Sequence, residues 1–264
     1  MERRLAVMAG AGALPGQAAA EAARQGWRVV ALTFDEATGL DGHADRVVPS
    51  SLTDIQAVLQ TLAAERVKAA LFVGKFGKQR LFDEYDEADE AGRGLVRGGL
   101  SDEALSGMVV ATLGSVGIEV LDQRPFFSTW VIETGPLTAR APAAAEWEEI
   151  RAGFALARHL AAHGIGQTVV RSRGVTLSVE AAEGTDETIR RGARLAGRGA
   201  VVVKAVAAEH DFRFDTPTIG PATIEAMAGC GAGVLAVDAG KVLLVDRDRA
   251  IRIADQAGIA LVGV

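Results

Sequence analysis

The sequence predicts an α/β chain in two parts, a Rossmann-like N-terminal domain with a parallel sheet and a C-terminal domain of mixed α+β type. In the first part, short apolar runs alternate with helical patterns, as they do in βαβ units. In the second part, hairpin patterns and helices are mixed. Between them, residues 134–145 carry two prolines and no hydrophobic periodicity. We therefore expect domains at 1–135 and 146–264, joined by a linker at 136–145.

Composition limits the possible partners and compartments. The 264 residues are 49% hydrophobic and 23% charged, which suffices for one large core or two smaller ones. A net charge of −6, with no long basic run, argues against nucleic acid. The single cysteine, Cys230, excludes a disulfide framework and a cysteine-based zinc site, and it fits the cytoplasm. No stretch approaches the ~20 apolar residues of a membrane span, and glycines interrupt the apolar N-terminal run that would otherwise resemble a secretion signal.

The N-terminal domain is predicted to begin with a βαβ unit and to continue with alternating helices and strands. Pro15 suits the first turn of the first helix, and Ser51 with Asp54 forms a capping-box pattern before the second. The expected elements are strand Leu5–Ala9, a helix to about Gln25, strand Trp27–Phe34, helix Ser51–Arg66, strand Ala69–Val73, a helix from Ser101 to near Gly117, and strands Ile118–Leu121 and Phe127–Glu133.

The turn at Gly10–Pro15 resembles half of a dinucleotide-binding fingerprint. Gly10 and Gly12 match its first two glycines, and Asp35 stands where a ribose-binding acid would. The third glycine is displaced by one place, to Gly16. Such partial patterns also occur in α/β proteins that bind other phosphates or none, so the ligand of this turn stays open.

A basic loop follows the strand Ala69–Val73. It holds Lys75, Lys78 and Arg80 at the carboxyl end of the strand, where ligands bind in open α/β sheets. These cations suit an anionic group. They equally suit charge balance with the acidic segment 83–90, so both interpretations remain open.

The C-terminal domain is predicted to combine an amphipathic helix, a hairpin and further strands and helices. The expected elements are helix Glu146–His163, hairpin strands Gln167–Arg171 and Val175–Glu180, a helix capped by Thr185 or Asp186 and ending at Arg194, strand Ala200–Lys204, helix Pro221–Ala228, strands Val234–Asp238 and Lys241–Val245 about a turn at Ala239–Gly240, a helix capped by Asp246, and strand Ile259–Val264.

Charged residues suited to phosphoryl chemistry gather in this domain. Lys204 ends a buried strand and would be costly to bury without a phosphate or carboxylate partner. Four carboxylates merit comparison: Glu180, Glu183, Asp186 and Asp215. Glu183 and Asp186 open a helix, where acids often serve only as caps, whereas Asp215 has no cap position.

Oxygen ligands with few histidines and one cysteine suit a hard ion such as Mg²⁺, with Mn²⁺ as a second candidate. Neither a Gly-x-Ser-x-Gly nucleophile motif nor a Walker lysine loop is present, which disfavours acyl hydrolases and P-loop enzymes. The residues therefore favour metal-assisted attack of water on phosphorus.

Several motifs spread over nearly the whole chain form one recognisable set. They are Ala9–Pro15, Val73–Lys78, Ile165–Gln167, Val179–Asp186, Lys204 and Phe212–Pro221. Together they resemble one family, the UDP-2,3-diacylglucosamine pyrophosphatases of the lipid A pathway, of the type unrelated to calcineurin-like phosphoesterases. The resemblance implies two linked domains with the substrate between them, and Mg²⁺-dependent hydrolysis of UDP-2,3-diacylglucosamine to UMP and 2,3-diacylglucosamine 1-phosphate.

The resemblance also assigns roles to residues. Asp215 and Lys204 would be catalytic, and Asp215 with Glu183 would hold the metal. His210 stands where relatives often have glutamine, so no role is carried over to it. The substrate-binding residues implied are Gly10, Gly12, Leu14, Pro15, Lys75, Gln167, Glu183, Gly184, Thr185, Asp186, Thr218 and Gly220.

The same resemblance implies an acylated UDP-sugar as substrate, a possible homodimer, and transient contact with the inner face of a membrane, because two acyl chains need access to a lipid surface. Two other classes stay open. One is a nicotinamide-dependent oxidoreductase built on residues 1–135, against which the displaced third glycine counts. The other is a non-catalytic sugar-nucleotide sensor, against which Asp215 and Lys204 count.

Overall fold

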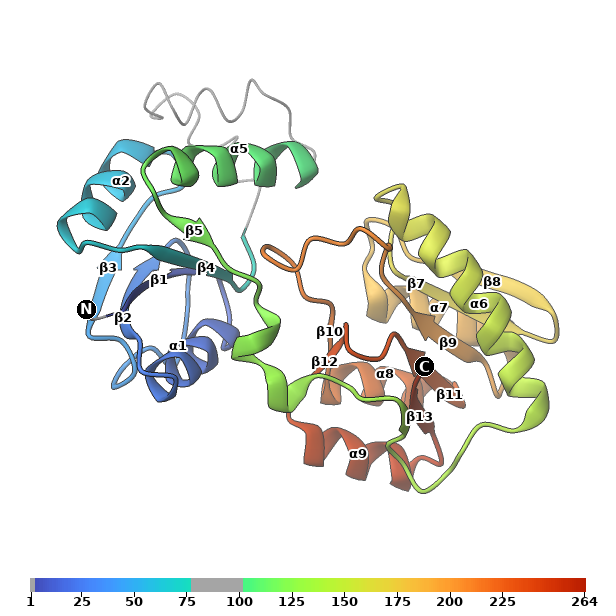
Figure 1. The fold of residues 1–264 in the computed structure, drawn as a ribbon. Helices are drawn as coiled ribbons and strands as arrows, with labels where there is room; N and C mark the ends of the chain where they lie inside the picture. The colour runs from blue at the N-terminus through green and yellow to red at the C-terminus, as the bar shows by residue number, and fades with distance from the viewer. Residues whose placement is uncertain (1–2, 77–101) are drawn as a thin grey trace. The chain divides into compact units, whose positions relative to one another are not determined.

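The computed structural model describes residues 3–76 and 102–264, and it divides into two compact units (Figure 1). Unit 1 comprises the chain up to Phe127 together with Asp211–Asp215, and unit 2 comprises Ser128–His210 and Thr216–Val264. The α/β class is confirmed, with a parallel sheet in unit 1 and a mixed sheet in unit 2. The sequence-based boundaries at 135 and 146 stay predictions.

Unit 1 is a parallel sheet of strand order β3-β2-β1-β4-β5. Helices α2 and α5 cover the face that holds Met8, Leu32 and Phe72, and the small residues of α1, such as Ala18 and Ala22, are buried as well. The elements are β1 Arg4–Ala9, α1 Leu14–Arg24, β2 Arg28–Thr33, β3 Arg46–Pro49, α2 Ile55–Ala64, β4 Ala69–Val73, α5 Asp102–Ser115 and β5 Glu119–Val120.

Unit 1 differs from the predictions in three places. Strand β3 was missed, because it has only four residues and its outer position leaves most of them exposed. The expected strand Phe127–Glu133 was wrong, since two 3₁₀ turns, η2 Arg124–Phe126 and η3 Ser128–Trp130, take up its beginning and the residues before it, and Pro125 favours such a turn. Asp54, not Ser51, caps α2, accepting a hydrogen bond from the Ala57 amide at 3.0 Å. The predicted Ser101 cap and the charged residues at 78–90 lie outside the described residues.

Unit 2 is built on a mixed sheet of order β6-β13-β11-β9-β7-β8. Strands β9, β11 and β13 are parallel, and β7 runs antiparallel to both β9 and β8. A small second sheet joins β10 and β12. The elements are β6 Gly135–Pro136, α6 Ala144–Ala162, β7 Thr168–Ser172, β8 Val175–Val179, α7 Thr185–Ala196, β9 Val201–Lys204, β10 Thr218–Ile219, α8 Pro221–Cys230, β11 Val234–Val237, β12 Leu243–Leu244, α9 Arg247–Gln256 and β13 Ala260–Gly263.

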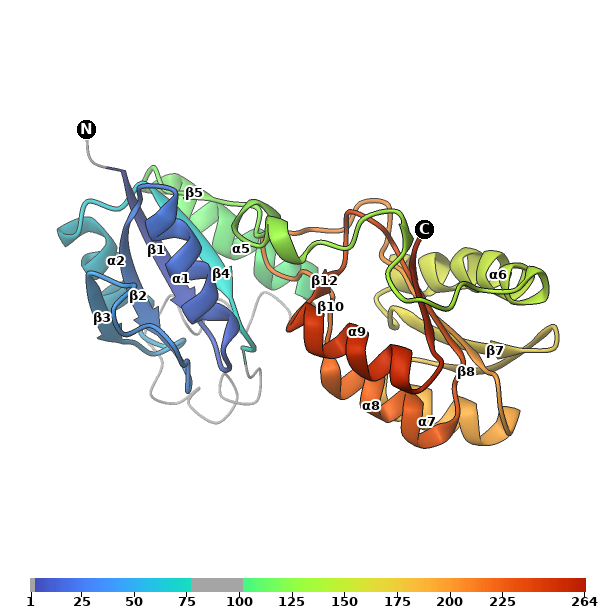
Figure 2. The same ribbon diagram turned by 90° about the horizontal axis from the view of Figure 1, so that it is seen from below.

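Helices cover both faces of the larger sheet (Figure 2). Helix α6 packs on the face that carries Val201 and Val203, and α7, α8 and α9 pack on the face of Val202. This alternation follows the two-residue period of a strand. Lys204 therefore belongs to the face of α7, a placement that matters for the site below.

Some predictions for unit 2 need correction. The predicted strands 234–238 and 241–245 do not pair with each other, because β11 joins the large sheet and β12 pairs with β10. Gly184, rather than Thr185 or Asp186, occupies the cap position of α7. Asp246 holds the cap position of α9 but makes no side-chain cap hydrogen bond there, since its backbone is left-handed with φ of 46°.

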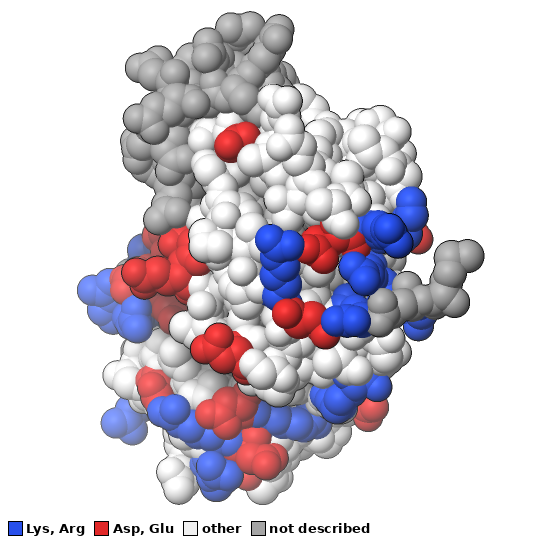
Figure 3. All heavy atoms as spheres, turned by 90° about the vertical axis from the view of Figure 1, so that its left-hand side faces the viewer, with Lys and Arg blue, Asp and Glu red and all other residues white. Residues whose placement is uncertain are grey.

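Charges of both signs are interspersed on the part of the surface seen in Figure 3, where the grey atoms are not considered. Ion pairs in unit 1 such as Arg28–Asp45 and Arg4–Glu65 fit this mixture. Among the described helices, none is long and apolar enough to cross a membrane.

Two glycines in helices of unit 2 give a matched test of the packing. A Cβ at Gly192 in α7 would lie 2.6 Å from Val170 Cβ and against the Ser178 hydroxyl, whereas a Cβ at Gly229 in α8 would meet nothing within 4 Å. We expect Gly192→Ala to lower the free energy of unfolding by about 1–3 kcal/mol through overpacking. Gly229→Ala should be neutral or raise it by up to about 1 kcal/mol, from helix propensity. Urea unfolding measures both, and equal stabilities of the two variants would contradict the packing described.

Candidate active site

In unit 1, the predicted glycine turn lies where β1, β2 and β4 end. The Ala11 amide donates to Lys75 O at 2.8 Å, the Lys75 amide donates to Ala11 O at 3.0 Å, and the Gly12 amide donates to Glu36 O at 3.0 Å. A Cβ on Gly10 would lie 2.5 Å from Lys75 O, so only glycine permits this backbone contact. The structure thus brings Gly10, Gly12 and Lys75 together, with Leu14 and Pro15 beginning α1 beside them.

The displaced third glycine has a structural explanation. A Cβ on Gly16 would lie 2.5 Å from the carbonyl carbon of Gly39, in the loop after β2. Gly16 therefore allows α1 to approach that loop closely. This contact gives no support for a dinucleotide.

The segment Asp211–Asp215 belongs to unit 1, although both chain neighbours belong to unit 2. The Phe214 ring lies 5.1 Å from the Phe72 ring, and the Gln123 amide donates to Phe212 O at 3.0 Å. Gln123 also donates from Nε2 to Phe72 O at 2.8 Å. These contacts hold the segment on the ends of β4 and β5 and leave Asp215 exposed.

Arg213 and Asp211 form a local pair within this segment. Arg213 donates to both carboxylate oxygens of Asp211, at 2.9 and 2.8 Å. The hydrogen bonds that it donates to Asp211 raise the pKa of the Arg213 guanidinium. Asp211 thereby neutralises the cation nearest to Asp215 in sequence.

In unit 2, polar side chains gather along the edge of the large sheet where strands β8, β9 and β11 have their carboxyl ends. Strands β8, β9 and β11 run in the same direction, so Glu180, Lys204 and Asp238 all come from the carboxyl ends of strands. Helix α7 begins at the same edge, with Gly184 at φ of 81° before its first turn. In open α/β sheets this edge is the usual location of ligands, and a helix N-terminus favours anions.

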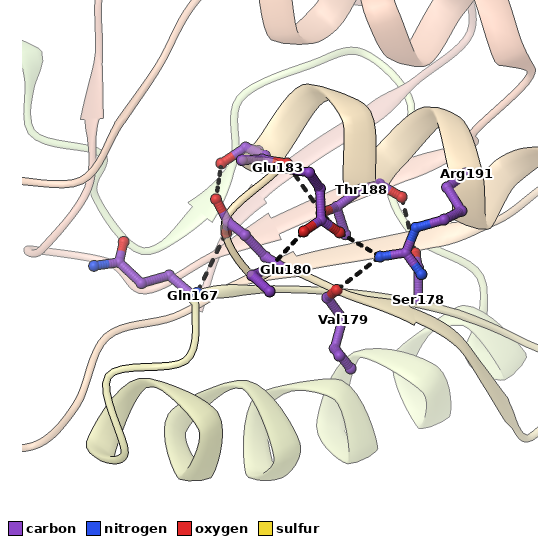
Figure 4. Close-up of polar contacts among 10 residues, drawn as sticks. Gln167, Ser178, Val179, Glu180, Glu183, Thr188 and Arg191 are labelled. Atoms are coloured by element: carbon purple, nitrogen blue, oxygen red, sulfur yellow. Dashed lines mark hydrogen bonds and ion pairs between the residues drawn. The ribbon is translucent and has the colours of Figure 1, made fainter. Parts of the chain in front are cut away.

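The centre of this group is a chain of three side chains. Lys204, which is 5% exposed, donates from Nζ to Thr185 Oγ1 at 2.9 Å. The Thr185 hydroxyl in turn donates to Glu180 Oε1 at 2.8 Å, and Nζ lies 3.9 Å from Glu180 Oε2. The backbone amide of Gln167 donates to the same Oε2 at 3.3 Å (Figure 4). We name Lys204, Thr185 and Glu180 the Lys–Thr–Glu chain.

Glu183 lies nearby but is engaged elsewhere. Its carboxylate accepts hydrogen bonds from Arg191, from the Thr188 hydroxyl at 3.1 Å and from the Ala181 amide at 3.2 Å (Figure 4). Backbone hydrogen bonding first, and Arg191 second, lower the pKa of Glu183. As a metal ligand, Glu183 would have to exchange these partners for the ion.

Asp238 was not singled out from the sequence. Its carboxylate is almost fully buried, accepting from Arg158 at 2.6 Å and from the Val206 amide at 3.0 Å, and its amide donates to Lys204 O at 3.1 Å. It therefore fixes the backbone on both sides of Ala205. A charged residue at the end of an apolar run, as in Glu180 and Lys204, was the sequence signal that could have found it.

An unpaired hydroxyl lies beside Lys204. Thr168 is directly opposite Lys204 in the β7–β9 register, so both side chains are on the same face. Thr168 is fully buried, and its Oγ1 has no hydrogen-bond partner among the described residues. An unsatisfied buried hydroxyl costs free energy, so it calls for an explanation such as backbone strain, a functional role or a bound water.

The other predicted residues lie as follows. Asp186 is in the first turn of α7, Thr218 donates from its hydroxyl to Thr216 O at 2.9 Å, and Gly220 precedes α8. A Cβ on Gly220 would lie 2.5 Å from Val245 Cγ2, which gives this glycine a packing role. Within the described residues, no group of three or more histidine, cysteine, aspartate or glutamate side chains is arranged to hold a metal.

The lowered pKa of Glu183 has a measurable consequence. A carboxylate whose folded-state pKa is lowered stabilises the fold above its unfolded pKa, about 4.3 for glutamate, and that contribution is lost as the pH falls through the folded value. We expect Glu183→Gln to be less stable than the wild type at neutral pH and to approach it below about pH 4. Urea unfolding against pH measures this difference, and Glu187→Gln, whose carboxylate is paired with exposed Arg190, is the control. A difference that stays constant with pH would contradict the assignment.

Comparisons with known proteins identify the family. Sequence profiles described as the LpxI N-terminal domain and the LpxI C-terminal domain match residues 4–130 and 133–262. The chain is 30% identical to UDP-2,3-diacylglucosamine pyrophosphatase LpxI of Caulobacter vibrioides, covering 99% of this chain and 98% of that protein.

Among solved structures, two synthetases are similar. N5-carboxyaminoimidazole synthetase from Staphylococcus aureus has 14% identity and a TM-score of 0.25, covering 73% of this chain and 45% of that chain. N5-carboxyaminoimidazole ribonucleotide synthetase from Thermotoga maritima has 13% identity and a TM-score of 0.25, covering 69% and 42%. This chain thus spans less than half the length of either, and the likeness has no bearing on function. From its match to both domain profiles and to the Caulobacter protein, the chain belongs to the LpxI family.

Proposed function

We propose that this protein hydrolyses the pyrophosphate bond of UDP-2,3-diacylglucosamine and releases UMP and 2,3-diacylglucosamine 1-phosphate, as a step of lipid A synthesis. The observation that carries the proposal is family membership over both domains. A relative named UDP-2,3-diacylglucosamine pyrophosphatase LpxI also aligns with this chain over 98% of its own length. Both domain profiles of the family match this chain.

The Lys–Thr–Glu chain supports a phosphate-handling role for unit 2. Lys204 brings a nearly buried ammonium to the carboxyl edge of the sheet, where α7 begins. Fixed positive charge in a site of low water content stabilises the charge that develops on phosphate oxygens during transfer. The Thr185 hydroxyl accepts from this ammonium and donates to Glu180, whose carboxylate also accepts from the Gln167 backbone amide, and these contacts would orient Lys204.

Asp215 supports the metal-dependent part of the proposal. It is an exposed carboxylate on an anchored segment, and its neighbour Arg213 is already neutralised by Asp211. Mg²⁺ commonly takes one or two protein carboxylates and completes its shell with water and substrate phosphate, so an aspartate of this kind fits the ion. Glu183 would hold the ion only by releasing Arg191 and Thr188, which contact its oxygens. Bound Mg²⁺ would supply charge neutralisation and activation of water.

The turn at Gly10–Pro15 would bind the nucleotide or sugar phosphate part of the substrate in unit 1. Exposed Lys75 lies beside it, because its backbone is bonded to Ala11. An acylated substrate also implies transient contact with a membrane surface, and a homodimer is a further expectation. Vesicle sedimentation and light scattering test these two additions.

The experiment is release of UMP from UDP-2,3-diacylglucosamine, measured with Mg²⁺, with Mn²⁺ and with EDTA. We expect turnover that needs the metal, and a loss of at least about 100-fold in Asp215→Ala, the scale of removing a group that stabilises the transition state. Asp215→Asn, which keeps the shape and removes the charge, should lose activity similarly.

Glu209→Gln serves as the matched control, since it removes one carboxylate from the same loop region, in unit 2, and should retain turnover. Cooperative unfolding of each variant excludes a folding defect. No release by the wild type with either metal would overturn the proposed substrate. Full activity of Asp215→Ala would overturn the role of that residue alone.

A further inference from the structure

The directions of the hydrogen bonds in the Lys–Thr–Glu chain are fixed by chemistry. An ammonium can only donate and an ionised carboxylate can only accept. The Thr185 hydroxyl therefore accepts from Lys204 and donates to Glu180, at 2.9 and 2.8 Å. Its single proton is committed to Glu180, so the carboxylate determines which way the hydroxyl points, and the hydroxyl in turn fixes the ammonium.

Glu180 is itself firmly held. Its second carboxylate oxygen accepts a hydrogen bond from the Gln167 backbone amide at 3.3 Å. The Glu180 backbone amide donates to Thr168 O at 2.8 Å. A Cβ on Gly166 would lie 2.9 Å from Glu180 Cβ and would also overlap the Glu180 carbonyl group. Glycine at 166 thus permits the close approach of the two chain segments. The carboxylate is tied to β7, and β7 pairs directly with the strand that carries Lys204.

Burial makes this interaction strong. The side chains of Lys204 and Glu180 are 6% and 12% exposed. Charges shielded from water interact more strongly than exposed pairs, whose contribution is small. The removal of one partner from such a pair leaves the other charge uncompensated, which is a large perturbation.

The neighbouring carboxylate does not share this arrangement. Glu183, three residues further on, is turned to Arg191 and Thr188 on α7 (Figure 4), whereas Glu180 accepts from the Gln167 backbone amide and the Thr185 hydroxyl. Two glutamates of one short turn thus have separate partners.

We propose that Glu180 is a positioning residue that acts through Thr185 to hold the Lys204 ammonium in place for a phosphate of the substrate. This inference rests on the proposed function and extends it to a residue outside the predicted site. Glu180 itself does not touch the substrate. Its effect on turnover passes entirely through Lys204.

A double-mutant cycle tests this dependence, because residues that act through one another give non-additive losses. The variants are Glu180→Gln, Lys204→Met and the two combined, assayed for kcat and KM. We expect kcat of Glu180→Gln to fall by about 10- to 100-fold, the scale of a small misplacement of a reacting group. Lys204→Met should lose at least as much, and the double variant should be no worse than Lys204→Met. Multiplied losses in the double variant, or an unchanged kcat in Glu180→Gln, would overturn the proposal.

Two further variants separate positioning from general destabilisation. Thr185→Ser keeps the hydroxyl and should retain most activity, whereas Thr185→Val should resemble Glu180→Gln. Glu187→Gln removes an exposed carboxylate from the same helix turn and should behave as the wild type. Equal activity of the serine and valine variants would contradict the role of the hydroxyl.

A binding measurement distinguishes failure of this proposal from failure of the proposed function. Calorimetry with inorganic pyrophosphate requires no turnover. We expect Glu180→Gln and Lys204→Met each to weaken binding, with no added effect in the double variant. If the wild type releases no UMP but this pattern appears, the substrate is wrong and the positioning role stands. Pyrophosphate that does not bind, or binds equally to all variants, overturns the positioning role.

Discussion

A nearly buried ammonium at the end of β9 is the constraint on which the candidate site of unit 2 depends. Lys204 cannot remain charged in such a place without oxygen partners. The fold supplies them from two other elements, Thr185 at the start of α7 and Glu180 after β8. These two elements reach the ammonium because β7 and β8 form a hairpin beside β9 and α7 returns across their face. The order of the strands in the sheet therefore determines which oxygen atoms stabilise the charge of Lys204.

In unit 1, close backbone contacts join the loops at the carboxyl ends of the strands. Gly10 and Gly74 let the loops after β1 and β4 touch, since a Cβ on either would lie within 3 Å of the other loop. The same unit holds Asp215, through the contact of Phe214 with Phe72. Each unit thus presents polar groups at the carboxyl ends of its strands, and each does so through short-range packing that a single methyl group would disturb.

The sequence predicted the strongly periodic elements, because alternating apolar runs and amphipathic helices carry their own signal. It failed for β3, which is exposed at an edge, and at 127–133, where the 3₁₀ turn Ser128–Trp130 follows another at Arg124–Phe126. Of the residues grouped around Lys204, the sequence singled out Glu180 and Thr185 but not Asp238 or Thr168, and it did not predict their partnerships. The link from Lys204 to Thr185 spans 19 residues and depends on how α7 packs, and the anchoring of 211–215 on unit 1 depends on tertiary contacts alone. Motif spacing carries neither kind of information.

In the proposed site, Lys204 contacts a phosphate group of the substrate. The most direct measurement is a crystal structure of the protein with UMP or 2,3-diacylglucosamine 1-phosphate bound. We expect a phosphate oxygen within hydrogen-bonding distance of Lys204 Nζ, with the Thr185 hydroxyl still donating to Glu180. A phosphate bound elsewhere, with the Lys204 side chain out of reach, would contradict this expectation.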